Sequence, residues 1–207
     1  MQKSKSDIDR RQRRRRRRIQ VVIIYSAIAV GLAWFFELQA TTTVIFVRHA
    51  EKALLPADNP GLSDAGNRRA AELARQLVDA DVVPGLGVDA VYSTSYRRTE
   101  ETAQPVATAL GLTITPYDAS NTASIMDEIV KEHKGKIVLV VGHSNTVPTL
   151  IYNMGASKKV PEINENEYDN MYLVSIPWFG KTKTIRLRYG EPYAPVGIPA
   201  GEPEGTD

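Results

Sequence analysis

The 207-residue chain contains no cysteine and only three histidines. Without cysteine it can form no disulfide and offers no thiolate to a metal ion. The third histidine does not stand at ligand spacing from His49 and His143, and arginines near those two positions would repel a cation. The sequence therefore argues against a metal centre.

Basic residues are much less frequent after residue 18 than before it. Residues 1–18 hold ten Lys and Arg against two Asp, a net of +8 within a total of +2, so the remainder carries −6. The remainder is therefore not basic, and we expect no nucleic-acid partner. A block of like charge this dense is typical of a disordered segment, which we predict for residues 1–18.

Charge is entirely missing from residues 19–36, "IQVVIIYSAIAVGLAWFF". As a helix these residues would extend about 27 Å, close to the ~30 Å hydrocarbon core of a bilayer. Trp34 and Phe35 lie at one end, where interfacial aromatics are common, and an arginine run precedes the other end. The positive-inside rule then places the N-terminus in the cytoplasm. We expect a single-pass helix over 19–36 in the inner (cytoplasmic) membrane, with the rest of the chain periplasmic or extracellular.

Three other uses of this segment are open. A cleavable signal peptide has the same basic and apolar regions, and its cleavage site would be near Leu38 and Ala40. Twin-arginine export is a second alternative, although the residues after the arginines do not resemble that motif. A buried helix of a soluble protein is the third, which the apolar surface on all sides and the polybasic flank disfavour.

Residues 41–190 form a block of single-domain size, and residues 191–207 form an acidic tail rich in Pro and Gly. Within the block, hydrophobic periodicity predicts strands at 43–47, 87–94, 112–115, 136–143, 171–176 and 182–189, and helices from 63, over 98–110, over 121–133 and from 146. This alternation predicts a three-layer α/β/α domain with a mainly parallel central sheet.

Unusual polar residues follow three of the predicted strands. Arg48 and His49 follow the first strand, Arg98 follows the second, and His143 ends the strand at 136–143. Because sites in such sheets lie beyond the carboxyl ends of strands, we expect these side chains to converge. Arginine binds phosphate through a planar fork of donors, and an imidazole nitrogen can attack phosphorus. The pattern predicts a phosphoryl-transfer site.

The same residues carry a family resemblance. "VRHAEK", "YSTSYRRTEETA" and "VVGHSNT" occur in that order, with "GLSDAG" before the first helix of the block. Together they resemble the motifs of the histidine phosphatase superfamily, which includes the phosphoglycerate mutases and the compact bacterial phosphohistidine phosphatases. The resemblance covers Thr43 to Gly155, and its register selects Arg98, four residues before Thr102, rather than Arg97.

The resemblance implies roles for these residues. His49 would be the nucleophile that becomes phosphorylated, and Arg48, Arg98 and His143 would bind the phosphoryl oxygens. Neither a metal nor an organic cofactor would be needed. The proton donor is less evident: Asp118 is the first candidate, with Glu51 and Asp169 behind it. The acidic stretch 162–170 is expected to be a solvated loop, with a position at the mouth of the site as the alternative.

These observations predict a membrane-anchored, metal-independent phosphatase that hydrolyses phosphomonoesters through a phospho-histidine. Its substrate would be a phosphorylated small molecule or a phosphoprotein. Two alternatives stay open in the same family, a phosphoglycerate mutase-type phosphotransferase and a protein-phosphohistidine phosphatase. A different class, a non-catalytic phosphate-binding scaffold on a membrane anchor, is disfavoured because all four central residues are present.

Overall fold

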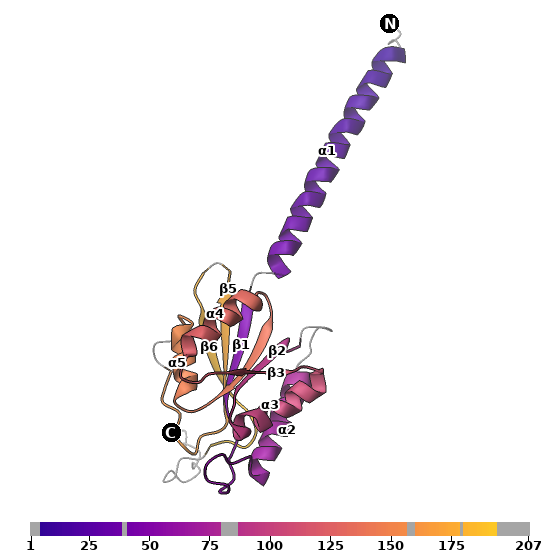
Figure 1. Cartoon of the computed structure of the whole chain (residues 1–207). Helices are drawn as coiled ribbons and strands as arrows, with labels where there is room; N and C mark the ends of the chain where they lie inside the picture. Colours follow the sequence, from indigo (N-terminus) through magenta and orange to yellow (C-terminus); the bar gives the residue numbers. More distant parts are fainter. Residues whose placement is uncertain (1–4, 39–40, 80–86, 157–159, 179, 194–207) are drawn as a thin grey trace, which may run out of the picture. The chain divides into compact units, whose positions relative to one another are not determined.

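The computed structural model describes residues 5–38, 41–79, 87–156, 160–178 and 180–193. The chain divides into two compact units, Met1–Ala40 and Thr41–Asp207. Figure 1 labels the helices and strands of both. Most of the tail predicted at 191–207 lies outside the described residues, so the structure does not test that prediction.

The N-terminal unit is one helix, α1 (Lys5–Leu38). Its stretch Gln12–Phe36 is long and apolar enough to cross a membrane, and a signal sequence would have the same properties. Residues 5–18 continue this helix, where a disordered segment was predicted. Arginine is a good helix former, and a helix that already runs through the apolar stretch extends without a new nucleus.

The second unit is built on a six-stranded sheet with the order β3-β2-β4-β1-β5-β6. The strands are β1 (Thr41–Arg48), β2 (Ala90–Thr94), β3 (Ile114–Tyr117), β4 (Ile137–Gly142), β5 (Asn170–Pro177) and β6 (Lys183–Arg188). The pairs β3–β2, β2–β4 and β4–β1 are parallel, whereas β1–β5 and β5–β6 are antiparallel.

The sheet is therefore mixed, and the prediction of a mainly parallel sheet was wrong. The two antiparallel pairs both involve β5. That strand begins beside the end of β1, with Met171 opposite Val47, so it runs back against β1. The connection from β5 to β6 is too short for a crossover helix, and a short connection joins antiparallel neighbours.

Helices cover both faces of the sheet and make three layers (Figure 1). The helices are α2 (Asp64–Asp79), α3 (Arg97–Leu110), α4 (Thr122–Glu132) and α5 (Thr146–Asn153). One core cluster joins the sheet to α2 and α3 through Leu73 and Val106. The other joins it to α4 and α5 through Ile129 and Leu150. The three-layer α/β/α arrangement follows from these two clusters.

β1 and β4 lie at the centre of the sheet and are buried on both faces. Val44 and Phe46 of β1 belong to one core cluster, while Ile45 and Val47 belong to the other. This alternation explains why the strand has no polar face: each side chain enters a core. The hydrophobic run ends only at Arg48, where the strand leaves the two cores.

Candidate active site

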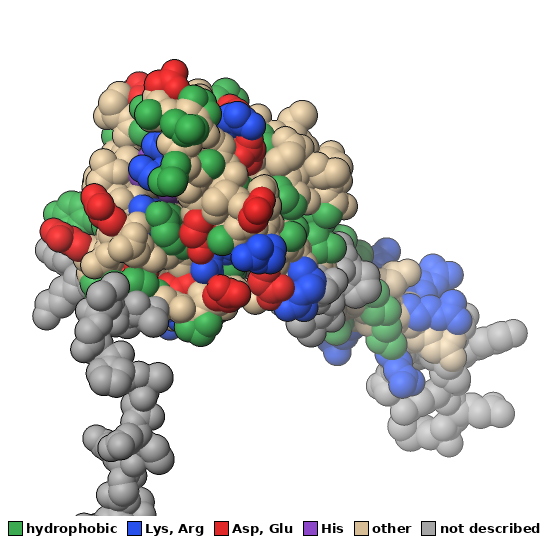
Figure 2. Space-filling model, turned by 90° about the horizontal axis from the view of Figure 1, so that it is seen from below, with side chains coloured by type: hydrophobic (Ala, Val, Ile, Leu, Met, Phe, Trp, Pro, Cys, Tyr) green, Lys and Arg blue, Asp and Glu red, His purple; other side chains and the backbone are tan. Residues whose placement is uncertain are grey.

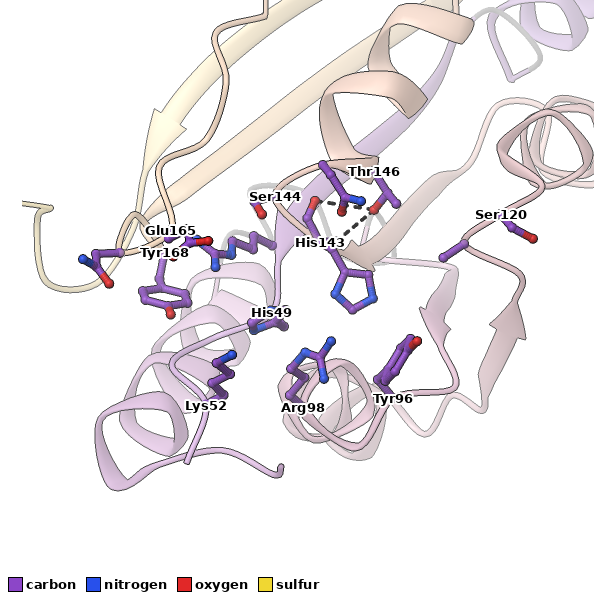
Figure 3. Close-up of a pocket in the computed structure, with 14 residues that line it drawn as sticks. His49, Lys52, Tyr96, Arg98, Ser120, His143, Ser144, Thr146, Glu165 and Tyr168 are labelled. Carbon is purple, nitrogen blue, oxygen red and sulfur yellow. Dashed lines mark hydrogen bonds between the residues drawn. The ribbon is translucent and has the colours of Figure 1, made fainter. Parts of the chain in front are cut away.

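The carboxyl ends of β1, β2 and β4 meet at one edge of the sheet, around a cavity of about 580 Å³. Its described lining comprises Arg48, His49, Lys52, Tyr96, Arg98, Ala119, Ser120, His143, Ser144, Asn145, Thr146, Glu165, Asn166 and Tyr168. Figure 3 shows the labelled members of this set around the cavity. On the face seen in Figure 2, histidine is visible beside Lys and Arg side chains. The four residues that sequence patterns singled out thus share one cavity.

The backbone register of two strands brings the histidines together. Arg48 lies opposite Gly142 in the β1–β4 ladder, and the next amide, that of His49, donates to the Gly142 carbonyl over 2.9 Å. His143 follows Gly142 directly, and the two imidazole centroids are 5.4 Å apart. A Cβ at Gly142 would lie 2.8 Å from the Tyr117 hydroxyl, so the packing of Tyr117 against this strand end depends on glycine.

The His49 side chain is buried, with 4% of its surface exposed, and has a defined tautomer. Its Nδ1 lies 2.8 Å from the Ala50 carbonyl oxygen. Because a carbonyl only accepts, Nδ1 carries the proton and Nε2 keeps its lone pair. Desolvation, followed by the charge of Arg48, lowers the pKa of His49 to about 3. The imidazole is therefore neutral near pH 7, as a nucleophile requires.

His143 lies in a similar environment. Its Nε2 is 2.9 Å from the Thr94 hydroxyl, which is in turn 2.8 Å from the Thr99 hydroxyl. Its backbone N–H donates to the Thr146 hydroxyl over 3.0 Å. Desolvation and the charges of Arg98 and Arg48 lower the pKa of His143 to about 4. Both imidazoles are thus neutral beside two guanidinium groups.

The two arginines keep donors that the described protein does not satisfy. Nη1 of Arg48 donates to the carbonyls of Asn164 (2.7 Å) and Glu167 (3.1 Å), and its Nε is buried without a partner. Nε of Arg98 is also buried without a partner in the described part of the chain. Buried donors are nearly always hydrogen-bonded in native proteins, so an acceptor is expected here. A tetrahedral oxyanion between the arginines would supply several acceptor oxygens.

The carboxylates proposed as proton donors are not in the cavity lining. Asp118 Oδ1 accepts from the N–H (2.8 Å) and the hydroxyl (2.7 Å) of Ser120, and these bonds lower the pKa of Asp118. Glu51 pairs with Arg69 at 2.8 Å. The carboxylate among the described lining residues is Glu165, which lies in the acidic stretch 162–170 and for which no role was predicted.

That acidic stretch is not the solvated loop that was expected. Glu167, Asp169 and Asn170 are all buried. Arg188 of β6 pairs with the Glu167 carboxylate at 2.8 Å and with Asp169 at 2.5 Å. Since two backbone carbonyls of the same stretch accept from Arg48, the segment forms a structural support for one side of the cavity.

Among the described residues, no group of three or more His, Cys, Asp or Glu side chains is placed to hold a metal ion. The donors that face the cavity are instead guanidinium, ammonium and imidazole groups, with the hydroxyls of Ser120 and Ser144. Such a set is suited to an anion.

Two neutral imidazoles and two guanidinium groups at the carboxyl edge of a three-layer α/β domain form a site that is suited to an oxyanion. A family model described as the histidine phosphatase superfamily (branch 1) matches residues 44–121. The match contains the motifs of His49 and Arg98, and the fold brings the third motif to them. The sequence resemblance to the histidine phosphatase superfamily is thereby confirmed over residues 44–121.

Two solved structures illustrate the similarity of fold. The protein histidine phosphatase SixA complexed with tungstate is 18% identical, with a TM-score of 0.56 over 70% of this chain and 96% of that one. A mycobacterial glucosyl-3-phosphoglycerate phosphatase complexed with VO3 is 11% identical, with a TM-score of 0.51 over 67% of this chain and 98% of that one. Comparison with curated proteins gives no match.

Proposed function

We propose that the chain is a phosphatase that hydrolyses phosphomonoesters through a phospho-histidine at His49. The observation that carries this proposal is a neutral imidazole, protonated on Nδ1 and with its Nε2 lone pair available, beside two arginines whose buried Nε donors have no partner among the described residues. The superfamily match supports the same reading.

In the first step, the lone pair of His49 Nε2 forms a bond to phosphorus while the bond from phosphorus to the leaving oxygen breaks. The leaving oxygen departs with the bonding electrons and takes a proton from an acid or from water. In the second step, a water oxygen attacks phosphorus, the P–N bond breaks, the water proton is released, and inorganic phosphate leaves. Arg48, Arg98 and His143 stabilise the equatorial oxygens through both steps, because their donors face the site of charge.

Glu165 replaces Asp118 as our first candidate for the acid in the first step. It lines the cavity, whereas the Asp118 carboxylate is bonded to Ser120. A carboxylic acid is required only where the leaving oxygen is a poor leaving group. The role of Glu165 is therefore testable by comparing leaving groups.

The lining also favours a polar leaving group. Apart from Ala119 and the rings of Tyr96 and Tyr168, every described lining residue has a hydrogen-bonding or charged side chain. A cavity of this size accommodates more than a phosphate ion, within the range of ~300–1,000 Å³ for small-molecule sites. A phosphorylated small molecule or the phosphorylated side chain of a protein fits this description, and an apolar lipid does not.

We further propose that α1 anchors the protein in the cytoplasmic membrane, with its N-terminus inside. The uncharged residues 19–36, within the candidate span Gln12–Phe36, and the arginine run just before residue 19 support this topology. A reporter fused after Asp207 is expected to be active only outside the cytoplasm. Activity of a cytoplasm-only reporter at the same position would reverse the orientation, and loss of α1 from the mature protein would identify a signal peptide.

The catalytic proposal is tested with the purified full chain in detergent. It is expected to hydrolyse an activated aryl phosphate without added metal, and His49→Ala is expected to abolish turnover. A matched control is His133→Ala, which removes an imidazole outside the cavity. Rapid quenching during turnover is expected to trap an acid-labile phosphoryl group on the unmodified chain but not on His49→Ala. Turnover that survives His49→Ala, or that disappears with a chelator, would refute the mechanism.

A further inference from the structure

The Arg98 side chain has few contacts that fix its orientation. No described acceptor forms a hydrogen bond or ion pair with its guanidinium, and its buried Nε has no partner. Among the described residues, this group instead stacks against an aromatic ring: Cζ of Arg98 lies 4.5 Å from the centroid of Tyr96. A long, flexible side chain that must present a planar fork to phosphate therefore relies on one neighbour.

Tyr96 is itself held firmly by its backbone. It is the N-cap residue of α3 and has an extended conformation. Its carbonyl accepts from the N–H groups of Thr99 (3.0 Å) and Glu100 (3.1 Å) and from the Thr99 hydroxyl (2.6 Å). The ring stands on this fixed backbone, with 44% of the residue exposed. It contributes little to the core, so its position beside the cavity calls for another explanation.

The same ring contacts a second member of the site. It meets the imidazole of His143 at right angles, with 5.2 Å between centroids. Figure 3 shows Tyr96 beside both Arg98 and His143 at the cavity wall. One aromatic side chain thus touches two of the groups assigned to the phosphoryl oxygens.

We propose that Tyr96 is the positioning residue that orients the Arg98 guanidinium toward the phosphoryl group. This inference rests on the proposed function and adds a residue to its machinery. The attraction between a guanidinium and an aromatic face holds Arg98 in the orientation that oxyanion binding requires. Without the ring, Arg98 must be ordered by the substrate at each binding event, and this cost weakens affinity.

The other arginine supplies an internal comparison. Cζ of Arg48 lies 4.2 Å from the centroid of Tyr168, in a similar arrangement. Arg48, however, also donates to two backbone carbonyls, those of Asn164 and Glu167. Its orientation is therefore overdetermined, and loss of Tyr168 is expected to matter less than loss of Tyr96.

The experiment measures the affinity of the full chain in detergent for tungstate, a tetrahedral dianion like phosphate, by calorimetry. Tyr96→Leu is expected to weaken tungstate binding roughly 5- to 30-fold. Tyr96→Phe keeps the ring and is expected to lose only about twofold, since the hydroxyl is not invoked. Tyr168→Leu is expected to cause a smaller loss than Tyr96→Leu. Tyr152→Leu, which removes an exposed tyrosine outside the cavity, is the matched control and is expected to bind as the unmodified chain does.

A double-mutant cycle decides between positioning and a general structural effect. If Tyr96 acts through Arg98, Tyr96→Leu has no further effect on tungstate affinity when Arg98→Gln is already present. An undiminished effect in that background would overturn the proposal, as would a Tyr96→Phe loss equal to that of Tyr96→Leu. Because this measurement needs no turnover, tungstate binding that depends on Tyr96 in a chain without hydrolysis would refute the proposed function and leave the positioning role intact. Hydrolysis by a chain whose tungstate affinity does not depend on Tyr96 would support the proposed function and refute the positioning role. A chain that does not bind tungstate would refute both proposals.

Discussion

The imidazoles of the cavity are expected to stay neutral in mild acid. The pKa of His49 is lowered to about 3 and that of His143 to about 4, in each case mainly by desolvation. At pH 5 a group with the pKa of His49 is only about 1% protonated, whereas one at the ordinary 6.5 is about 97% protonated. Acidification from pH 7 to pH 5 should therefore remove almost none of the neutral imidazole, whereas a pKa of 6.5 would reduce it about 25-fold.

Two measurements check this expectation. The first is an NMR titration of the imidazole C2–H signals of the full chain, assigned with His49→Ala, His143→Ala and His133→Ala. The second is the pH profile of kcat/KM for an aryl phosphate, corrected for the second ionisation of the substrate, whose pKa is about 6. A midpoint near 6.5 for His49, or an additional acid limb near 6.5 in the corrected profile, would refute the account of a buried neutral nucleophile.

The two histidines should respond differently to loss of Arg98. After desolvation, Arg98 is the largest cause lowering the pKa of His143, whereas for His49 it ranks behind Arg48 and His143. Arg98→Gln is therefore expected to raise the titration midpoint of His143 more than that of His49. Equal shifts, or a larger shift at His49, would contradict the placement of Arg98 beside His143.

Three further predictions concern the proton donor, the support of the cavity and acid stability. Glu165→Gln is expected to slow hydrolysis of alkyl phosphates by about 10²–10⁴-fold and to spare an activated aryl phosphate, while Asp118→Asn spares both; equal slowing of the two substrates would exclude Glu165 as the acid. Arg188→Met leaves two buried carboxylates without their cation and is expected to lower the free energy of unfolding by roughly 1–3 kcal/mol in urea titrations, a figure reduced because Arg188 is partly exposed; an unchanged midpoint would contradict the ion pairs. Below about pH 6.5 the unfolded state binds protons at His49 and His143, and the folded state does not. The free energy of unfolding is therefore expected to be highest above pH 6.5 and to decrease as the pH falls toward 4. Urea midpoints that increase as the pH falls from 6.5 to 4 would contradict this sign.

The residues of the cavity were predictable where they follow hydrophobic strands. The run before Arg48 and the run before His143 each mark a central strand, and the ends of parallel neighbours meet at one edge. The choice between Arg97 and Arg98 was also accessible, since it depends on a fixed spacing along one helix. The structure places Arg98 in the cavity and pairs Arg97 with Glu101 at 2.6 Å, outside it.

Other features depend on how distant segments fold back, which a local pattern does not reveal. Side chains alternate between the two faces of a strand whichever way the strand runs. The sequence of β5 therefore does not show whether it pairs with β1 in the parallel or the antiparallel direction. Tyr168 and Glu165 reach the cavity because the segment before β5 returns to the carboxyl edge. Its buried carboxylates are neutralised by Arg188, some twenty residues further on, and nothing nearby in the sequence indicates that partner. The polarity of the acidic stretch suggested that it is exposed to solvent, but its ion pairs with Arg188 allow Glu167 and Asp169 to be buried.

The central place of β1 has a consequence for biosynthesis. This strand is the first of the sheet to leave the ribosome, yet its two neighbours, β4 and β5, begin only at Ile137 and Asn170. For roughly ninety residues of elongation, its eight backbone units have no neighbouring strand to pair with. Such long-range pairing folds slowly and leaves a sticky segment open to other chains. A holdase chaperone that engages this segment during translation would therefore prevent aggregation more effectively than one that acts on the finished polypeptide.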